Sequence, residues 1–432
     1  MKFYSTNNKE SRVSLKEAVL QGLAPDNGLY LPVTIPRLPD SFFQDLPNKS
    51  FNELAYEVAY ALIGDDVPSS ELKKIIDQTI TFEAPLVKVG AFYALELFHG
   101  PTLAFKDFGG RFLAGLLGYY ARQQDREVTI LVATSGDTGS AVANGFLNVP
   151  GTKVVVLYPS GKVSEIQEKQ FTTLGENITA LEVEGTFDDC QRMVKEAFLD
   201  QELRTQLFLT SANSINIGRL IPQLFYYFRA HAQLGNHPNG VVFSVPSGNF
   251  GNLTAGLIAK RMGLPIDKFI ASTNINDVVP EYLNSGNFEP RPSKQTISNA
   301  MDVGHPSNFA RMLDLYHHDQ HALQKDIVGY HFTDKETSRE MKKVYQTEKY
   351  ILDPHGAVGL LGLKKYKAET GSTLTLVFLE TAHPGKFKEV VEASLNESLP
   401  LPDKLKQFLS KEKKSIPMKN NFVELKRILL KL

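Results

Sequence analysis

One lysine stands out because of the residues on either side of it. Lys106 lies in the segment HGPTLAFKDFGGRF, between Phe105 and Phe108, and an amphipathic helical pattern begins at Asp107. The positive end of a helix and the loss of water around an amine both lower the pKa of a lysine. Because an unprotonated amine is what Schiff-base chemistry requires, the segment favours that chemistry at Lys106. A surface lysine whose methylene groups pack on apolar neighbours explains the segment equally well.

A glycine-rich loop occurs twice, each time after an apolar run typical of a buried strand. The first copy is SGDTGS at Ser135–Ser140 and the second is SGNFGN at Ser247–Asn252. A strand that ends in glycines and continues into a helix offers free backbone N–H groups and the positive helix end to an anion. Two such loops predict two anion sites, for instance for a cofactor phosphate and a substrate carboxylate. The alternative is a pair of tight turns without a ligand.

Two more polar segments follow predicted strands. Thr381 comes directly after LTLVFLE, at the carboxyl end of a strand, where α/β sheets bind ligands. Asn213, Ser214 and Arg219 lie between a strand and a helix and combine amide, hydroxyl and guanidinium donors, a set suited to a phosphate group. The alternatives are a threonine that bonds to its own turn and an arginine in a salt bridge between domains.

Composition and missing motifs exclude several classes of function. The net charge of -1 over 432 residues gives no basic field for nucleic acid, and no apolar run has the length of a membrane span. The single cysteine, Cys190, excludes an internal disulfide, so a cytoplasmic location is expected. The dinucleotide and P-loop glycine motifs are absent. The histidine-rich segment at 317–321 lacks a third ligand, so no metal site is predicted.

Alternating strands and helices must position these residues from about Pro85 onward. Strands are predicted at 128–133, 153–158, 179–184, 207–210, 240–245, 269–273 and 373–379, and helices at 140–147, 163–174, 188–199, 218–233 and 252–261. This alternation is typical of parallel sheets with helices on both faces. The first eighty residues look helical, with capping boxes at Ser14 and Ser50. A long loop is predicted at 280–308 and a helix in the lysine-rich tail.

These segments, in this order, resemble the threonine synthases, within the tryptophan-synthase-like group (fold type II) of pyridoxal-phosphate enzymes. The matching segments are GLAPDNGLYLP, ELFHGPTLAFKDFGGRF, ATSGDTGSA, SANSINIGR, SGNFGN, MDVGHPSN, DPHGAVG and TAHPGKF. They extend over nearly the whole chain. Asn27, Gly356 and Gly385 depart from the usual pattern at positions to which no catalytic group is assigned.

The resemblance implies an α/β protein with two open, twisted, mostly parallel domains and the cofactor in the cleft between them. It implies an N-terminal, mainly helical domain at 1–84 and a large cofactor-binding domain at 85–111 and 213–400. A small α/β domain is expected at 112–212 and a C-terminal helical tail at 401–432.

The resemblance also implies a role for each candidate residue. Pyridoxal phosphate would form a Schiff base with Lys106, with Thr381 at its ring nitrogen and Asp137 nearby. Its phosphate would bind the backbone of the second glycine loop, at Gly248, Asn249, Phe250, Gly251 and Asn252. The substrate carboxylate would bind Ser135 and Thr138, and the substrate phosphate would bind Asn213, Ser214 and Arg219.

The implied reaction converts O-phospho-L-homoserine and water to L-threonine and phosphate, with Lys106 as general acid and base. The expected enzyme is a monomer or a homodimer without nucleic-acid or membrane partners. One alternative is a serine or threonine dehydratase of the same fold, which needs no site for a substrate phosphate. Another is a protein that binds pyridoxal phosphate or phosphorylated ligands without turnover.

Overall fold

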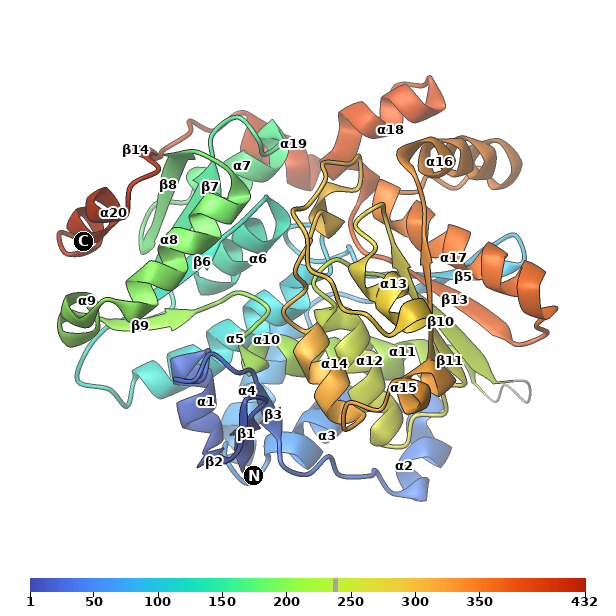
Figure 1. Cartoon of the computed structure of the whole chain (residues 1–432), viewed down its shortest axis with the longest axis horizontal. Coiled ribbons are helices and arrows are strands. Elements are labelled where there is room, and N and C mark those ends of the chain that lie inside the picture. The colour runs from blue at the N-terminus through green and yellow to red at the C-terminus, as the bar shows by residue number, and fades with distance from the viewer. Residues whose placement is uncertain (236–239) are drawn as a thin grey trace.

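Two mostly parallel sheets form the framework of the protein (Figure 1). The computed structural model describes residues 1–235 and 240–432. The larger sheet has the strand order β12-β11-β10-β13-β5-β4, and the smaller sheet has the order β14-β8-β7-β6-β9. Neighbouring strands in both sheets are parallel, except for the antiparallel pair β4 and β5.

The bounds of the strands follow the sequence closely. The larger sheet contains β4 (Leu86–Val89), β5 (Phe92–Glu96), β10 (Val241–Pro246), β11 (Lys268–Thr273), β12 (Ile327–His331) and β13 (Thr375–Glu380). The smaller sheet contains β6 (Val128–Ala133), β7 (Thr152–Pro159), β8 (Ile178–Glu184), β9 (Phe208–Ser211) and β14 (Ile416–Lys419). All seven strands predicted from the sequence are confirmed, each within two residues at either end.

Helices bury both faces of each sheet. Those near the smaller sheet are α5 (Lys106–Ala121), α6 (Asp137–Phe146), α7 (Glu165–Thr172), α8 (Phe187–Leu199), α9 (Gln201–Gln206) and α20 (Phe422–Leu429). Along β6, Ile130 and Val132 join one hydrophobic core, and Leu131 and Ala133 join the other core, which contains α8 and α20. Because successive side chains of a strand point to opposite faces, a sheet covered on both sides needs apolar residues in continuous runs.

The larger sheet is covered in the same way. Its helices are α10 (Ile217–Leu220), α11 (Phe225–Leu234), α12 (Gly251–Arg261), α13 (Val278–Ser285), α14 (Phe309–Leu315), α15 (Gln320–Asp326), α16 (Asp334–Glu348), α17 (Pro354–Thr370) and α18 (Lys388–Leu395). Helix α19 (Asp403–Leu409) packs instead against α7 of the smaller sheet. Short 3₁₀ helices lie at η1 (Leu46–Asn48), η2 (Ile221–Leu224), η3 (Asn299–Met301) and η4 (Pro384–Phe387). All five predicted helices are confirmed, and the one at 218–233 is divided at Pro222, which has no N–H to donate.

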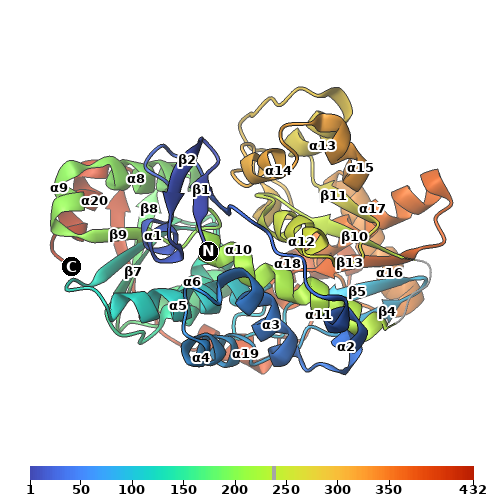
Figure 2. The ribbon, with the colours of Figure 1, turned by 90° about the horizontal axis from the view of Figure 1, so that it is seen from below.

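The N-terminal region combines helices with a small sheet that the sequence analysis missed. The helices are α1 (Leu15–Gln21), α2 (Asp40–Asp45), α3 (Phe51–Ile63) and α4 (Ser69–Thr79), and both predicted capping boxes, at Ser14 and Ser50, are confirmed. Strands β1 (Phe3–Ser5), β2 (Asn8–Val13) and β3 (Tyr30–Pro32) form an antiparallel sheet of their own. Figure 2 shows β1 and β2 beside α1, with α3 and α4 further along the same side.

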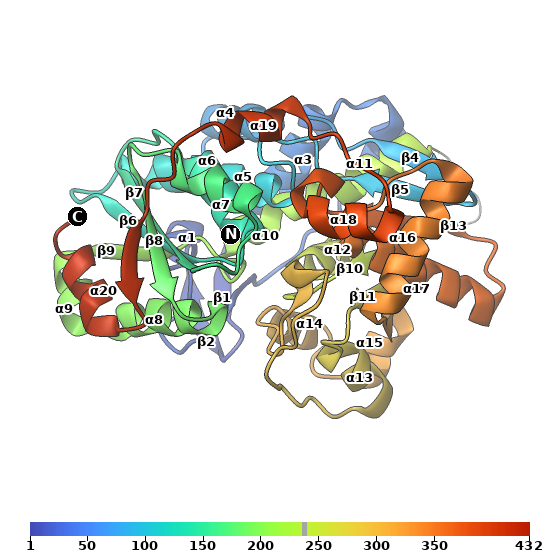
Figure 3. The same cartoon turned by 90° about the horizontal axis from the view of Figure 1, so that it is seen from above.

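The sequence analysis predicted a helical C-terminal tail, but the tail also contains strand β14 (Ile416–Lys419). Figure 3 shows the chain running from α18 through α19 to β14, so that residues 401–432 cross from the larger sheet to the smaller one. Met418 in β14 is buried in the same core as Leu425 of α20. Pro417 is tolerated because β14 is an edge strand, where a missing N–H breaks no ladder between two neighbours.

The loop predicted at 280–308 is shorter than expected. Its first residues belong to α13, whereas residues 286–298 contain neither helix nor strand. Within the described part of the chain, no helix combines the length and the apolar character needed to cross a bilayer.

The tail should contribute to the stability of the smaller sheet. Leu425→Ala removes a fully buried side chain from α20, so we expect a loss of about 2–5 kcal/mol in the free energy of unfolding measured in urea. Val423→Ala is the matched control on the same helix, because Val423 is 73% exposed, and should cost no more than about 0.5 kcal/mol. Equal effects of the two substitutions would contradict the packing of α20 against α8.

Candidate active site

The residues singled out from the sequence gather at the carboxyl ends of parallel strands. The Ser247–Asn252 loop follows β10 and Thr381 follows β13, and these strands are neighbours in the larger sheet. The Ser135–Ser140 loop follows β6 and Asn213 follows β9, which are neighbours in the smaller sheet. Each sheet therefore contributes two adjacent loops at the edge where parallel sheets bind ligands.

Lys106 is the first residue of α5, and the end of β13 holds the residues before it. Phe105 N donates to Thr381 O at 2.8 Å, and His383 N donates to Leu103 O at 3.0 Å. These bonds fix Lys106 next to Thr381. The buried carboxylate of Asp107 accepts hydrogen bonds from Thr102 N at 2.9 Å and Thr102 Oγ1 at 2.6 Å, which fixes the turn that leads into the helix.

The surroundings of Lys106 favour its unprotonated form. Loss of water around the amine lowers the pKa of Lys106 to about 8; the charges of Arg219 and Lys386 act in the same direction, and the charge of Asp137 opposes them. Among the described residues, Lys106 forms no ion pair. At a pKa of about 8, roughly a tenth of the amine is unprotonated at pH 7.

The second glycine loop is shaped by close contacts rather than by its own side chains. Ser247 N donates to Ser272 O, and the first backbone bond of α12 runs from Thr254 N to Phe250 O, so the amides from Gly248 to Asn252 precede the helix ladder. A Cβ at Gly248 would lie 2.7 Å from Met301 Cα. The loop is thus pressed against residues 300–303 and presents backbone donors at a helix N-terminus.

The asparagine side chains of this loop are engaged within the protein. Asn252 Oδ1 accepts from Ser247 Oγ at 2.6 Å, and Asn252 Nδ2 donates to Pro246 O at 2.9 Å. Asn249 Nδ2 donates to Ser214 Oγ, and Asn249 Oδ1 accepts from Ser307 N. The second glycine loop is therefore joined directly to the segment that contains Arg219.

The first glycine loop wraps around Thr134. Thr134 Oγ1 accepts hydrogen bonds from Gly136 N at 2.9 Å and from Gly139 N at 2.8 Å. Gly136 has a φ of 139°, a backbone conformation that favours glycine. Ser135 and Thr138 are half-buried, and their hydroxyl groups make no hydrogen bond to any residue that the structure describes. Both hydroxyls are therefore available to a ligand.

Arg219 is a buried cation with unused donors. Its side chain lies against Gly109 of α5, and its Nη1 donates to Ala212 O at 2.5 Å, while Nε has no partner among the described residues. Burial lowers the pKa of Arg219 to about 10, well above neutral pH, so the guanidinium stays charged. A buried charge without a partner is costly, so this side chain is suited to receive an anion.

Asn213 and Ser214 differ in how they are used. The amide of Asn213 bonds to the backbone of Ala133, with Nδ2 donating to the carbonyl at 2.8 Å and Oδ1 accepting from the N–H at 3.3 Å. It therefore joins β6 to the loop after β9. Ser214 Oγ accepts from Asn249 and Asn308, which leaves its own proton free for a further acceptor.

The side chain of Glu380 packs directly against Gly356. A Cβ at Gly356 would lie 1.4 Å from Glu380 Oε2, so the Glu380 side chain fills the space that a side chain at 356 would occupy. Burial raises the pKa of Glu380 well above its ordinary value, and the charge of Asp353 raises it further. The uncharged form of Glu380, the residue immediately before Thr381, is therefore favoured.

One residue of the site was missed from the sequence. Lys386 of η4 is fully buried and forms an ion pair with Asp137 at 2.9 Å. Its segment, TAHPGKF, was used only for Thr381. The sequence gives little indication that Lys386 belongs to the site, because the spacing of residues does not show which loop a long side chain reaches.

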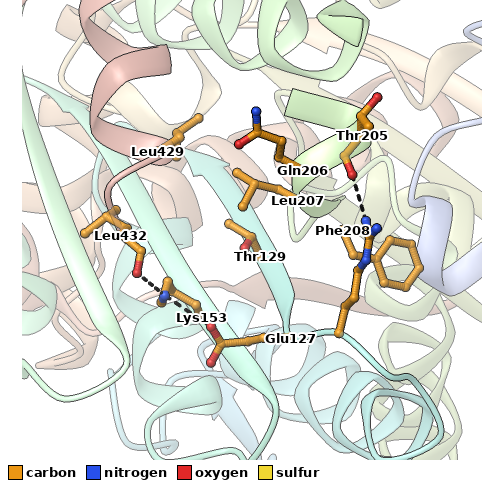
Figure 4. Close-up of a pocket in the computed structure, with 10 residues that line it drawn as sticks. Glu127, Thr129, Lys153, Thr205, Gln206, Leu207, Phe208, Leu429 and Leu432 are labelled. Atoms are coloured by element: carbon orange, nitrogen blue, oxygen red, sulfur yellow. Dashed lines mark hydrogen bonds and ion pairs between the residues drawn. The ribbon is translucent and has the colours of Figure 1, made fainter. Parts of the chain in front are cut away.

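A cavity of about 560 Å³ lies elsewhere and contains none of these residues (Figure 4). It is lined by Thr129 and Lys153, near the starts of β6 and β7, and by Leu429 and Leu432 of the tail. Lys153 bonds to Leu432 O and forms an ion pair with Glu127 at 3.1 Å. Because it lies at the amino ends of the strands, this cavity is not the candidate active site.

Comparison with known proteins identifies the family. The family of pyridoxal-phosphate dependent enzymes matches residues 75–381, and the threonine synthase N-terminal and C-terminal families match residues 2–80 and 356–429. Threonine synthase of Haemophilus influenzae is 48% identical over 435 residues, covering 100% of both chains. The chain belongs to the threonine synthase family.

Solved structures of this family have the same fold. The crystal structure of threonine synthase from Escherichia coli matches with a TM-score of 0.93 and 43% identity over 100% of both chains. The pyridoxal-phosphate-bound threonine synthase from Brucella melitensis matches with a TM-score of 0.93 and 35% identity over 100% of this chain and 99% of that one. The fold is fold type II, and the chain is a pyridoxal-phosphate dependent lyase that acts on a small molecule.

The residues present fit pyridoxal phosphate. Lys106 supplies an amine whose pKa is lowered to about 8, and the second glycine loop supplies a backbone cradle that a side chain at Gly248 would fill. Thr381 carries a hydroxyl that makes no hydrogen bond to the rest of the described chain. An aldehyde, a phosphate and a ring nitrogen thus each have a matching group.

The cradle should be sensitive to its first glycine. Gly248→Ala places a methyl group 2.7 Å from Met301 Cα, so the loop must shift, and we expect the Kd for pyridoxal phosphate to rise at least about tenfold in titrations of the apoprotein. Gly251→Ala tests loop packing, because its Cβ would come no closer than 3.5 Å to another residue. We expect this control to retain the melting temperature of the apoprotein, while Gly248→Ala lowers it. Unchanged cofactor affinity in Gly248→Ala would remove the loop from the phosphate site.

Proposed function

We propose that this protein converts O-phospho-L-homoserine and water to L-threonine and phosphate. The observation that carries the proposal is Arg219, a buried guanidinium with an unpartnered Nε whose charge acts on Lys106. A dehydratase of the same fold has no use for such a group, whereas a substrate with a phosphate on its side chain does. Ser214, with a free hydroxyl proton, supports Arg219 as a donor to that phosphate.

The chain's own residues supply binding, orientation and proton transfer. Pyridoxal phosphate, bound through Lys106, supplies the electron withdrawal that makes protons at Cα and Cβ of the substrate acidic. Lys106 removes these protons and returns them as general base and acid, for which an amine with a pKa of about 8 is well matched. Thr381 would hold the ring nitrogen with its hydroxyl, and because this group is neutral rather than a carboxylate, it would leave that nitrogen unprotonated and moderate the electron withdrawal.

Two further groups orient the substrate. Ser135 and Thr138, with unused hydroxyls at the start of α6, bind the α-carboxylate. Arg219 and Ser214 hold the phosphate while the bond from its oxygen to Cγ breaks. The oxygen of water forms its new bond to Cβ, and a proton is added at Cγ, so that threonine and phosphate account for all the atoms of the substrate and of one water molecule.

The proposal also includes the division into domains, the oligomeric state and the cellular location of the protein. The strand content of the two sheets supports a large domain at 85–111 and 213–400, a small domain at 112–212, and flanking regions at 1–84 and 401–432. The enzyme is a monomer or a homodimer. The single cysteine, Cys190, is buried and unpaired, which supports a cytoplasmic location.

Lys106→Ala should abolish the reaction. We expect the variant to lose both the absorbance of lysine-bound cofactor and the formation of threonine from O-phospho-L-homoserine, because no other amine replaces Lys106. Lys162→Ala, at an exposed position, is the control and should retain both. A wild-type protein that binds the cofactor and releases no phosphate would favour the alternative of binding without turnover.

Arg219→Met should distinguish this reaction from serine or threonine deamination. Loss of a charged donor to the departing phosphate should lower kcat/KM for O-phospho-L-homoserine by roughly a hundredfold or more. Any deamination of serine should change far less, because serine carries no phosphate. Arg122→Met, which removes an exposed arginine paired with Glu71, should change neither rate. Similar losses with both substrates would contradict the assignment of Arg219 to the phosphate.

A further inference from the structure

Lys386 is a buried cation for which the reaction described above gives no role. It lies in η4, five residues after Thr381, and its side chain has no exposure to solvent. A buried ammonium group is stable only when its charge and its protons are matched by partners.

Three acceptors match the three ammonium protons of Lys386. Its Nζ lies 2.9 Å from Asp137 Oδ1, 2.8 Å from Gln170 Oε1 and 2.7 Å from Thr102 O. Each acceptor comes from a different element: α6, α7 and the turn before α5. Lys386 therefore joins the end of the larger sheet to helices of the smaller sheet.

One of these contacts leads back to Lys106. The carbonyl of Thr102 bonds to Lys386, while the N–H and the hydroxyl of Thr102 are held by Asp107, the residue after Lys106. Gln170 Nε2 donates to the same carbonyl at 3.1 Å. The position of the Lys106 turn is thus fixed in part by Lys386.

Another contact sets the charge opposite Lys106. Asp137 Oδ1 accepts from Gln167 Nε2 at 2.8 Å as well as from Lys386, whereas Oδ2 has no hydrogen bond to the described residues. Burial raises the pKa of Asp137, but the charges of Lys386 and Lys106 and these hydrogen bonds outweigh it, so the pKa falls to about 2. Asp137 is therefore a carboxylate at neutral pH.

We propose that Lys386 is a positioning residue for this active site: it holds the Asp137 carboxylate near Lys106 and offsets its negative charge, so that Lys106 can release its proton and accept the cofactor. The inference rests on the proposed function only in taking Lys106 as the cofactor lysine.

The charges around Lys106 explain why this balance matters. The groups that face it are Asp137 from α6, Arg219 from α10 and Lys386 from η4. Without Lys386, the negative charge of Asp137 would act on Lys106 without being offset, and the protonated form of Lys106 would be favoured. With Lys386 in place, its ion pair with Asp137 compensates the negative charge of Asp137, so Lys106 does not need to stay protonated to do so.

The test measures the proton on Lys106 in the apoprotein, without substrate turnover. Acetic anhydride labels unprotonated amines, so the acetylated Lys106 peptide, quantified by mass spectrometry across a pH series, gives a titration midpoint. We expect a midpoint of about 8 in the wild-type apoprotein. In Lys386→Met the midpoint should rise by about one pH unit, which lowers the unprotonated fraction at pH 7 roughly tenfold. Addition of pyridoxal phosphate to this apoprotein at pH 7 should slow by a similar factor.

Two further variants separate charge from structure. Lys386→Arg retains the cation and should return the midpoint toward the wild-type value. Asp137→Asn should lower the midpoint, and adding Lys386→Met to Asp137→Asn should move the midpoint far less than Lys386→Met moves it in the wild type, because the carboxylate that Lys386 offsets is gone. If Lys386→Met does not fold, Lys386→Gln replaces it, because glutamine keeps a donor for Asp137 without the charge and should raise the midpoint in the same way.

The test of Lys386 can fail without affecting the test of the proposed function. Lys260→Met, which breaks an ion pair with Asp326, is the control and should not move the midpoint. A folded Lys386→Met whose midpoint equals that of the wild type would overturn the role of Lys386, and so would a Lys386→Met effect that is as large in the Asp137→Asn background as in the wild type. Neither result would change whether the wild-type protein makes threonine.

Discussion

The active site depends on a lysine that can lose its proton among buried charges. The charges of Arg219 and Lys386 both act on Lys106, which also lies near the carboxylate of Asp137, and Asp107 acts on Arg219. Burying a charge is costly unless a partner compensates it. Asp137 is compensated by Lys386, which leaves Arg219 as a cation available to an anionic ligand. A site with excess positive charge suits an anionic cofactor and an anionic substrate.

The fold brings these charges together by ending four strands at one place. Strands β6 and β9 of the smaller sheet and β10 and β13 of the larger sheet each end in a segment of the candidate site. Hydrogen bonds cross between these segments, from Asn213 to Ala133, from Asn249 to Ser214, and from Lys386 to Asp137. The relative position of the two sheets therefore determines the geometry of the site. The N-terminal sheet adds support, because Arg311 bonds both to Tyr30 O and to Ile215 O.

Local patterns predicted the elements and the loops, but not the contacts between loops. The seven strands and both capping boxes follow from periodicity and turn residues, which act over a few positions. Strand β14 was missed because Met418 is recognisable as a core residue only once the tail reaches β8. The role of Lys386 was missed for the same reason, since its partners at 102, 137 and 170 are far away in the sequence. The amide of Asn213 likewise reaches the backbone of Ala133, a contact that no local pattern predicts.

The central claim is that phosphate leaves by cleavage of the bond between carbon and oxygen, and that water adds to a different carbon. The most direct test is to incubate the purified holoenzyme with O-phospho-L-homoserine in water enriched in heavy oxygen and to analyse both products by mass spectrometry. The claim predicts equal amounts of threonine and phosphate, with one heavy oxygen in each threonine and none in the newly released phosphate. Heavy oxygen in the phosphate, or homoserine as the product, would show a hydrolase and contradict it.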